Sequence, residues 1–199
     1  MKNVLFICLA FSFKVCSAQG DTSFIRVNFL YGSKPAKGFK KTESKRFGGI
    51  KGGHVNIEMD GRCLDFGPGG NCHVFPNKKN PNGKFCIHDK LKWDTLNDKS
   101  AYILVPVTKF QKDSLEKIFT SYSSQTPFDY AVFGNRCASA SYRVLNYIGL
   151  VDKERSVLSN FYPKLVRKKL YKWAKRNNYY VKKFGGRDSR IWESDQGLL

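Results

Sequence analysis

Hydrophobic and polar residues alternate over several short stretches in the first half of the chain, as they do in half-buried β-strands. This pattern predicts strands at residues 25–31, 54–59, 62–66, 85–88 and 101–107, with residues 71–76 as a further candidate. Asp60-Gly61, between the second and third of these, is the strongest short-range signal of a β-hairpin. Residues 101–107 are almost all apolar, which predicts a central, buried strand.

Helical spacing of apolar residues appears only in the second half of the chain. It predicts helices over residues 111–122 and 136–147, the latter capped by Asn135 and ended near Gly149, and a third, strongly basic helix within residues 162–180. Strands followed by helices indicate an α+β fold, with an antiparallel sheet packed against helices. We expect a single domain over residues 19–184 and a polar tail over residues 185–199.

The first 18 residues have the composition of a secretory signal peptide. Lys2 precedes a short apolar run at residues 4–13, and Cys16-Ser17-Ala18 supplies small residues for cleavage. The alternatives are a buried N-terminal strand or helix, or a lipoprotein signal with Cys16 lipidated. The signal predicts an exported protein, either periplasmic or secreted.

The charge of the chain is strongly positive. Its 199 residues include 35 Lys and Arg against 16 Asp and Glu, a formal net charge of +19, while the hydrophobic share of 41% excludes a wholly disordered chain. Basic residues with interleaved aromatics fill the third predicted helix, and the candidates for contact with an anionic surface are Lys168, Lys169, Lys172, Lys175 and Arg176. An exported protein meets an anionic membrane or envelope polymer first, so we rank nucleic acid below these partners. The simpler alternative is a solvated helix face.

The hairpin predicts which side chains share a face of the sheet. With a two-residue turn at Asp60-Gly61, Glu58 lies opposite Cys63 and Asn56 opposite Asp65, and His54 projects to the same face as these four. Asp65 is then diagonal to His54, about 7–8 Å away. A carboxylate there could accept the proton of one imidazole nitrogen and leave the other nitrogen as a base.

Cys137 falls in the first turn of the second predicted helix, on its inward face. The partial positive charge of a helix start and the neighbouring Arg136 both favour a thiolate. A thiolate facing a histidine on a strand is the arrangement of cysteine hydrolases. Taken singly, each residue also has an ordinary structural explanation, as a core cysteine, a strand-end histidine or an ion-paired aspartate.

Two stretches together resemble the circularly permuted papain-like hydrolases. They are residues 52–61, with Gly53-His54 opening a strand, and Asn135-Arg136-Cys137 opening a helix. The superfamily groups bacterial cell-wall peptidases and amidases with the lecithin–retinol acyltransferase type. The resemblance covers roughly residues 24–150, with Asn56 in place of the usual small residue and Arg136 between the Asn and the Cys.

The resemblance implies a permuted papain-like fold and an enzyme without a cofactor. Cys137 would be the nucleophile, His54 the acid–base, and Asp65, by position, the residue that orients His54. The substrate would be an amide or ester in a peptide, peptidoglycan or lipid, for a hydrolase or an acyltransferase. The alternative is a catalytically inactive basic protein that binds anionic envelope polymers or a membrane surface.

Removal of the signal would leave four cysteines. In an oxidising compartment we expect one disulfide among Cys63, Cys72 and Cys86, most simply one that involves Cys72, with Cys137 free. A metal site is the alternative, but no Cys-x-x-Cys spacing supports it; its candidate ligands are His54, Cys63, Cys72, His73 and His88.

Overall fold

A six-stranded antiparallel sheet forms the centre of the molecule. The computed structural model describes residues 23–32, 52–89, 98–153 and 157–186. The strands lie in the order β4-β3-β2-β1-β5-β6, with bounds β1 (Ser23–Tyr31), β2 (Gly53–Met59), β3 (Arg62–Pro68), β4 (Gly83–Asp89), β5 (Ser100–Val107) and β6 (Tyr180–Phe184). The α+β class and the antiparallel sheet are therefore confirmed. The expected signal peptide and most of the tail lie outside the described residues.

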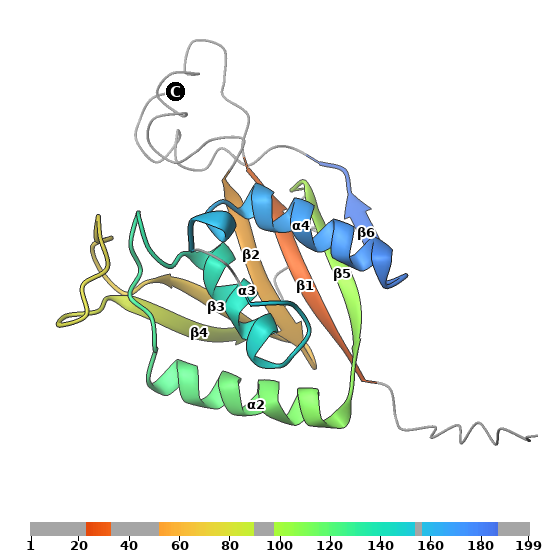
Figure 1. Cartoon of the computed structure of the whole chain (residues 1–199), viewed down its shortest axis with the longest axis horizontal. Helices are drawn as coiled ribbons and strands as arrows, with labels where there is room; N and C mark the ends of the chain where they lie inside the picture. Colours follow the sequence, from red (N-terminus) through yellow and green to blue (C-terminus); the bar gives the residue numbers. More distant parts are fainter. Residues whose placement is uncertain (1–22, 33–51, 90–97, 154–156, 187–199) are drawn as a thin grey trace, which may run out of the picture.

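Helices pack on one face of this sheet. α3 (Cys137–Tyr147) and α4 (Pro163–Arg176) lie across it, α2 (Lys109–Ser124) runs along its border, and the short 3-10 helix η2 (Val157–Asn160) precedes α4 (Figure 1). Alternate strand residues such as Val27, Phe29 and Ile57 point under the helices and are fully buried. Among the described residues, we find no helix with the length and apolar character needed to cross a membrane.

The predicted hairpin forms at β2 and β3. Asp60 and Gly61 have φ angles of 49° and 78°, as a two-residue hairpin turn requires. The pairs Met59↔Arg62, Glu58↔Cys63 and Ile57↔Leu64 have the predicted register. The backbone pairing ends there, so the pair expected between Asn56 and Asp65 is not part of the ladder.

At the N-terminal end of β2, helix α3 lies along the side of the strand that β3 leaves unpaired. The buried Ser141 hydroxyl donates to the Val55 carbonyl at 3.1 Å, and the Val55 N–H bonds the Cys137 sulfur. Cys137 and Ser141 are one helical turn apart, so both face the same stretch of β2. The backbone groups that β3 leaves unpaired thus hold the start of α3 against the sheet.

Helix α3 begins one residue later than predicted. Arg136, with an extended backbone (φ −133°), is the N-cap residue in place of Asn135. The Ser139 hydroxyl completes the cap, because it accepts from the Arg136 N–H at 2.8 Å and donates to the Arg136 carbonyl at 3.1 Å. Cys137 is therefore the first helical residue, where backbone N–H groups have no partner within the helix.

Of two other predicted elements, one is absent and one is confirmed within its predicted range. Residues 71–76 do not form a strand and make only an isolated bridge between His73 and Ala131. The basic helix predicted within residues 162–180 is confirmed as α4; it ends at Arg176, since Asn178 adopts a positive φ of 56° and the chain returns as β6. β6 pairs with β5, which gives β5 a neighbour on both sides, as predicted for a central strand.

Candidate functional site

Cys137 and His54 meet where the start of α3 approaches the first residues of β2. The thiol and the imidazole share a hydrogen bond, and the Val55 N–H donates a second one to the sulfur. Cys137 is only 6% exposed, whereas the His54 side chain is 28% exposed. The sulfur is therefore shielded from bulk water, and the imidazole forms the more open side of the pair.

Asp65 holds the other side of the imidazole. Its Oδ1 bonds His54 Nε2, which leaves Nδ1 as the ring nitrogen for the thiol. The predicted diagonal placement of Asp65 and His54 thus brings their side chains into contact. All three residues proposed from the sequence come together in one chain of contacts, Cys137 to His54 to Asp65.

Electrostatics favour a charged pair at Cys137 and His54. Burial opposes ionisation of the thiol, but the charge and hydrogen bond of His54, the Val55 N–H and the charge of Arg136 together lower the pKa of Cys137. Burial likewise disfavours the imidazolium, yet Cys137 and Asp65 outweigh it and raise the pKa of His54 well above its ordinary value. The two directions agree with a thiolate–imidazolium pair.

Two further side chains, Asn56 and His88, hold Asp65. Asn56 Nδ2 donates to its Oδ2 at 3.1 Å, and His88 Nε2 lies 2.7 Å from the same oxygen. Burial disfavours the carboxylate, but His54, Asn56 and His88 together lower the pKa of Asp65 to about 2. The carboxylate is therefore ionised over the whole physiological pH range and oriented by both of its oxygens.

Below Asp65 the polar network continues into the centre of the sheet. Asn28 donates to Asn56 Oδ1 at 3.1 Å and to Glu58 Oε2 at 3.2 Å, and Arg26 forms an ion pair with Glu58 at 3.1 Å. Asn56 is fully buried, so these bonds satisfy a polar group that would otherwise be costly to bury. The predicted hairpin register already places Asn56 opposite Asp65, but the pairing of β4 with β3 that brings His88 there has no local signal.

Tyr130 and Arg136 both interact electrostatically with Cys137. Burial and the charge of Cys137 raise the pKa of Tyr130, and the charge and hydrogen bond of Arg136 only partly offset them, so the phenol stays protonated. The Arg136 guanidinium lies 5.0 Å from the centre of the Phe161 ring. From the sequence, Arg136 was expected only to favour the thiolate by its charge, and Tyr130 was not expected near the site.

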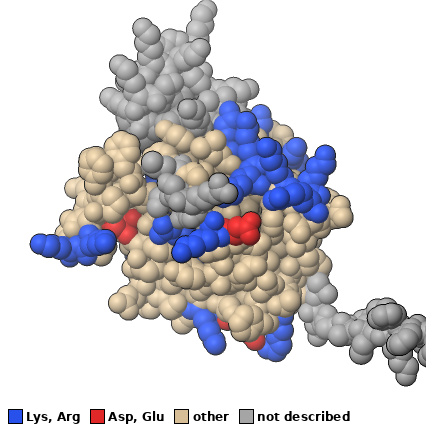
Figure 2. All heavy atoms as spheres, in the orientation of Figure 1, with Lys and Arg blue, Asp and Glu red and all other residues tan. Residues whose placement is uncertain are grey.

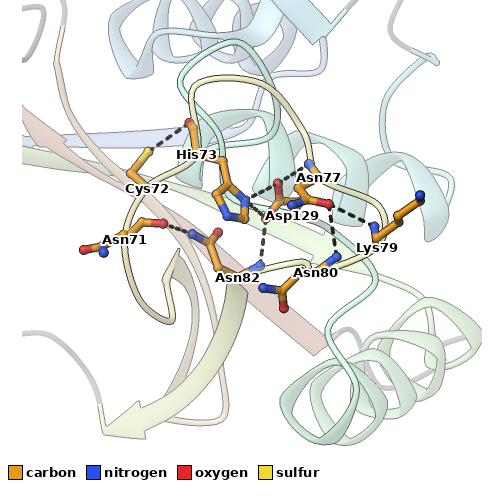
Figure 3. A network of polar contacts seen from close by, with 8 residues as sticks. All are labelled: Asn71, Cys72, His73, Asn77, Lys79, Asn80, Asn82 and Asp129. Carbon is orange, nitrogen blue, oxygen red and sulfur yellow. Dashed lines mark hydrogen bonds and ion pairs between the residues drawn. The ribbon is translucent and has the colours of Figure 1, made fainter.

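The remaining cysteines and His73 were candidates for a disulfide or a metal site. None of Cys63, Cys72, Cys86 and Cys137 is in a disulfide, so the described residues do not contain the expected one. Cys63 lies opposite His88, and Cys86 lies opposite Asp65, so Cys63 and Cys86 are diagonal neighbours in the sheet. Diagonal neighbours are too far apart for a disulfide. His73 bonds Asp129 in a separate cluster (Figure 3). Over the four described ranges, no group of three metal-binding side chains comes together.

The predicted basic residues form the outer face of α4. Lys168, Lys169, Lys172, Lys175 and Arg176 are all exposed, and Lys and Arg side chains gather over α4 and β6 (Figure 2). Arg167 on the same helix is instead buried and lies 3.5 Å from the centre of the Tyr31 ring. The exposed face is thus a basic surface, and Arg167 is part of the packing beneath it.

Comparison with known proteins assigns no family, since no family model, curated protein or solved structure matches this chain.

Proposed function

We propose that this protein is a cysteine-nucleophile hydrolase or acyltransferase that acts on an amide or ester bond. The supporting observation is the hydrogen-bonded Cys137–His54 pair, with the pKa of the thiol lowered and that of the imidazole raised. A core cysteine or a surface histidine needs no such arrangement. Asp65, on the far imidazole nitrogen, completes a Cys-His-Asp triad.

The first half-reaction forms an acyl-enzyme. The Cys137 thiolate attacks the carbonyl carbon, a C–S bond forms, and the carbonyl π electrons move to the oxygen. The backbone N–H of Cys137, at the start of α3, donates to this oxyanion. As the oxyanion collapses, the bond to the leaving nitrogen or oxygen breaks, and the His54 imidazolium gives its proton to the leaving group.

The second half-reaction frees the enzyme. Neutral His54 removes a proton from water, or from an acceptor alcohol or amine, and that oxygen or nitrogen attacks the thioester. The C–S bond breaks and the Cys137 thiolate leaves, again paired with the His54 imidazolium. Asp65 keeps Nε2 protonated throughout, so that Nδ1 remains the nitrogen that exchanges the proton.

The order and placement of elements support a permuted papain-like fold for this enzyme. The histidine strand β2 precedes the cysteine helix α3, and α3 packs on the sheet beside β2. In an exported protein, the amide or ester would belong to a peptide, to peptidoglycan or to a lipid.

A small aryl ester such as p-nitrophenyl acetate tests the proposal. We expect a burst of p-nitrophenol and an acetyl group on Cys137, identified by mass spectrometry of the trapped protein. Cys137→Ala abolishes the burst, and His54→Ala slows it at least about 100-fold, because the general base is lost. Cys86→Ala is the matched control, since Cys86 is an exposed cysteine outside the triad. A burst that survives in Cys137→Ala would exclude this nucleophile.

Binding of anionic envelope polymers is a second candidate function. The observation in its favour is the exposed basic face of α4, a helix that contains no acidic residue. This function needs no chemistry at Cys137 and can coexist with hydrolysis.

A further inference from the structure

Four apolar side chains project into solvent at the tip of two neighbouring loops. Val74, Phe75, Val132 and Phe133 are 57%, 67%, 38% and 54% exposed, and we call them the apolar tip. The rings of Phe75 and Phe133 stack with their centres 5.3 Å apart. Adjacent exposed apolar groups of this size mark a contact surface more often than single exposed residues do.

Backbone hydrogen bonds join the two loops that carry the apolar tip. The Val132 N–H donates to the His73 carbonyl at 2.7 Å, and the Phe133 N–H donates to the Val74 carbonyl at 2.9 Å. Gly134 allows Pro76 to pack closely, because a Cβ at residue 134 would lie 2.7 Å from the proline ring. The two phenylalanines are therefore held side by side by the backbone.

Asp129 anchors the base of the loop that carries Val74 and Phe75. Its carboxylate accepts from the backbone N–H of Asn77 at 2.7 Å and of Asn82 at 2.8 Å, and bonds His73 Nδ1 at 2.9 Å (Figure 3). Burial disfavours the ionised form, but these bonds outweigh it and lower the pKa of Asp129. These hydrogen bonds fix the loop in place, so the fold holds the apolar tip in its exposed position.

The exposed charged residues of the loop that carries Val74 and Phe75 are all basic. Lys78 and Lys79 are exposed on the first loop and Lys84 is exposed at the start of β4, and no acidic residue occurs between Asp65 and Asp89. Asp129, the acid of the second loop, is buried and fully engaged. Exposed aromatics rimmed by lysines complement a bilayer interface, where apolar chains lie beneath anionic head groups.

We propose that the apolar tip docks this protein onto anionic phospholipid bilayers. Phe75 and Phe133 enter the interface between head groups and acyl chains, and Lys78 and Lys79 contact the lipid phosphates. The second loop runs on from Phe133 into Arg136 and Cys137, so docking brings the start of α3 close to the lipid surface. The docking depends only on the apolar tip and its lysines and requires no activity at Cys137.

Vesicle sedimentation with phosphatidylglycerol–phosphatidylcholine mixtures tests this docking. We expect the wild-type protein to bind these vesicles, and Phe75→Ser/Phe133→Ser to bind at least about tenfold more weakly, because two aromatic side chains are lost from the interface. The matched control is Phe110→Ser, which removes a phenylalanine that is 78% exposed on α2; this variant should bind like the wild type. Equal binding by the double variant would overturn the proposal.

Charge reversal and lipid composition complete the test. Lys78→Glu/Lys79→Glu should weaken binding by about fivefold per lysine on anionic vesicles, and vesicles of phosphatidylcholine alone should bind the wild type weakly. Cys137→Ala should bind like the wild type, which separates this proposal from the proposed catalysis. Binding lost only on charge reversal of α4, or a self-association in sedimentation velocity that the double serine variant abolishes, would show that the apolar tip serves another role.

Discussion

At the residue scale, the candidate site is a short chain of charge-assisted hydrogen bonds from the Cys137 sulfur to Asp65. Each member changes the protonation of the next: Asp65 favours the imidazolium of His54, and that imidazolium favours the Cys137 thiolate. Asn56 and His88 fix the far end of this chain. The reactivity of Cys137 should therefore differ from that of the other cysteines in its dependence on pH.

Alkylation by iodoacetamide should reveal this difference. The lowered pKa of Cys137 predicts a rate that rises less steeply between about pH 6 and 8 than the rate of an ordinary thiol, because a larger fraction of the sulfur is thiolate. Cys72 is the internal control: burial and the charge of Asp129 raise its pKa despite Arg136, so its rate should rise about tenfold per pH unit. His54→Ala should give Cys137 the same steep profile, and a steep profile in the wild type would contradict the ion pair.

Asp65 should also stabilise the folded protein. Its pKa is about 2 when folded and about 4 when unfolded, which corresponds to about 2 kcal/mol. Because the folded pKa is the lower one, this stability is present above pH 4 and is lost as the pH falls to about 2. Asp65→Asn should therefore reduce the free energy of unfolding by about 2 kcal/mol at pH 7, measured by urea denaturation. It should also flatten the decline between pH 4 and 2, and an unchanged decline would contradict the assignment.

At the element scale, the site depends on where the β2–β3 ladder ends. Beyond Ile57↔Leu64 the Val55 backbone no longer pairs with β3 and instead binds Ser141 and Cys137 of α3. The early end of the ladder therefore allows the first turn of a helix to contact the start of a strand. Loss of the Ser141 bond should weaken this junction.

Ser141→Ala should lower the free energy of unfolding by about 1–2 kcal/mol, because the buried Val55 carbonyl loses its side-chain donor. Ser123→Ala in α2 is the matched control, since the Ser123 hydroxyl also donates to a carbonyl, that of Thr120, but is exposed. The control should change stability by less than about 0.5 kcal/mol in the same urea titration. Equal effects of the two variants would mean that the junction contributes nothing beyond an ordinary helix–serine bond.

At the scale of the whole molecule, positive charge is unevenly distributed between the surface and the interior. The chain has a net charge of +19, and many of its basic residues are exposed on the outer face of α4 and around the apolar tip. Some acidic residues are instead buried and bonded to other side chains, as Glu58 and Asp129 are. The surface is consequently more basic than the composition alone indicates. Such a surface attracts polyanions through a field that salt screens.

Lys168→Glu/Lys172→Glu should elute from immobilised heparin at a clearly lower salt concentration than the wild type. Lys109→Glu/Lys117→Glu on α2 makes the same change in net charge at two exposed lysines and serves as the control. A local basic surface on α4 predicts a larger shift for the first variant. Identical shifts would indicate that only the total charge matters.

Local patterns were sufficient for the elements that depend on neighbouring residues. Alternation located the strands, and Asp60-Gly61 set the register of the hairpin, because the turn forces the first pairs into place. Residues 71–76 show where prediction from local patterns fails. Their pattern is typical of a strand, but they form a loop in which His73 bonds Asp129, a residue more than fifty positions away. β6 was missed for a similar reason, since its pairing partner β5 is remote in sequence.

The sequence by itself determined the α+β class, the hairpin that sets His54 diagonal to Asp65, and the position of Cys137 in the first turn of a helix. These follow from turn geometry and periodicity, which act over a few residues. Only the tertiary structure decided that Cys137 touches His54, that His88 shares Asp65, and that Phe75 stacks on Phe133. Each of these contacts joins segments far apart in the chain, and they meet only because burial of the apolar faces packs α3 and the loops against the sheet.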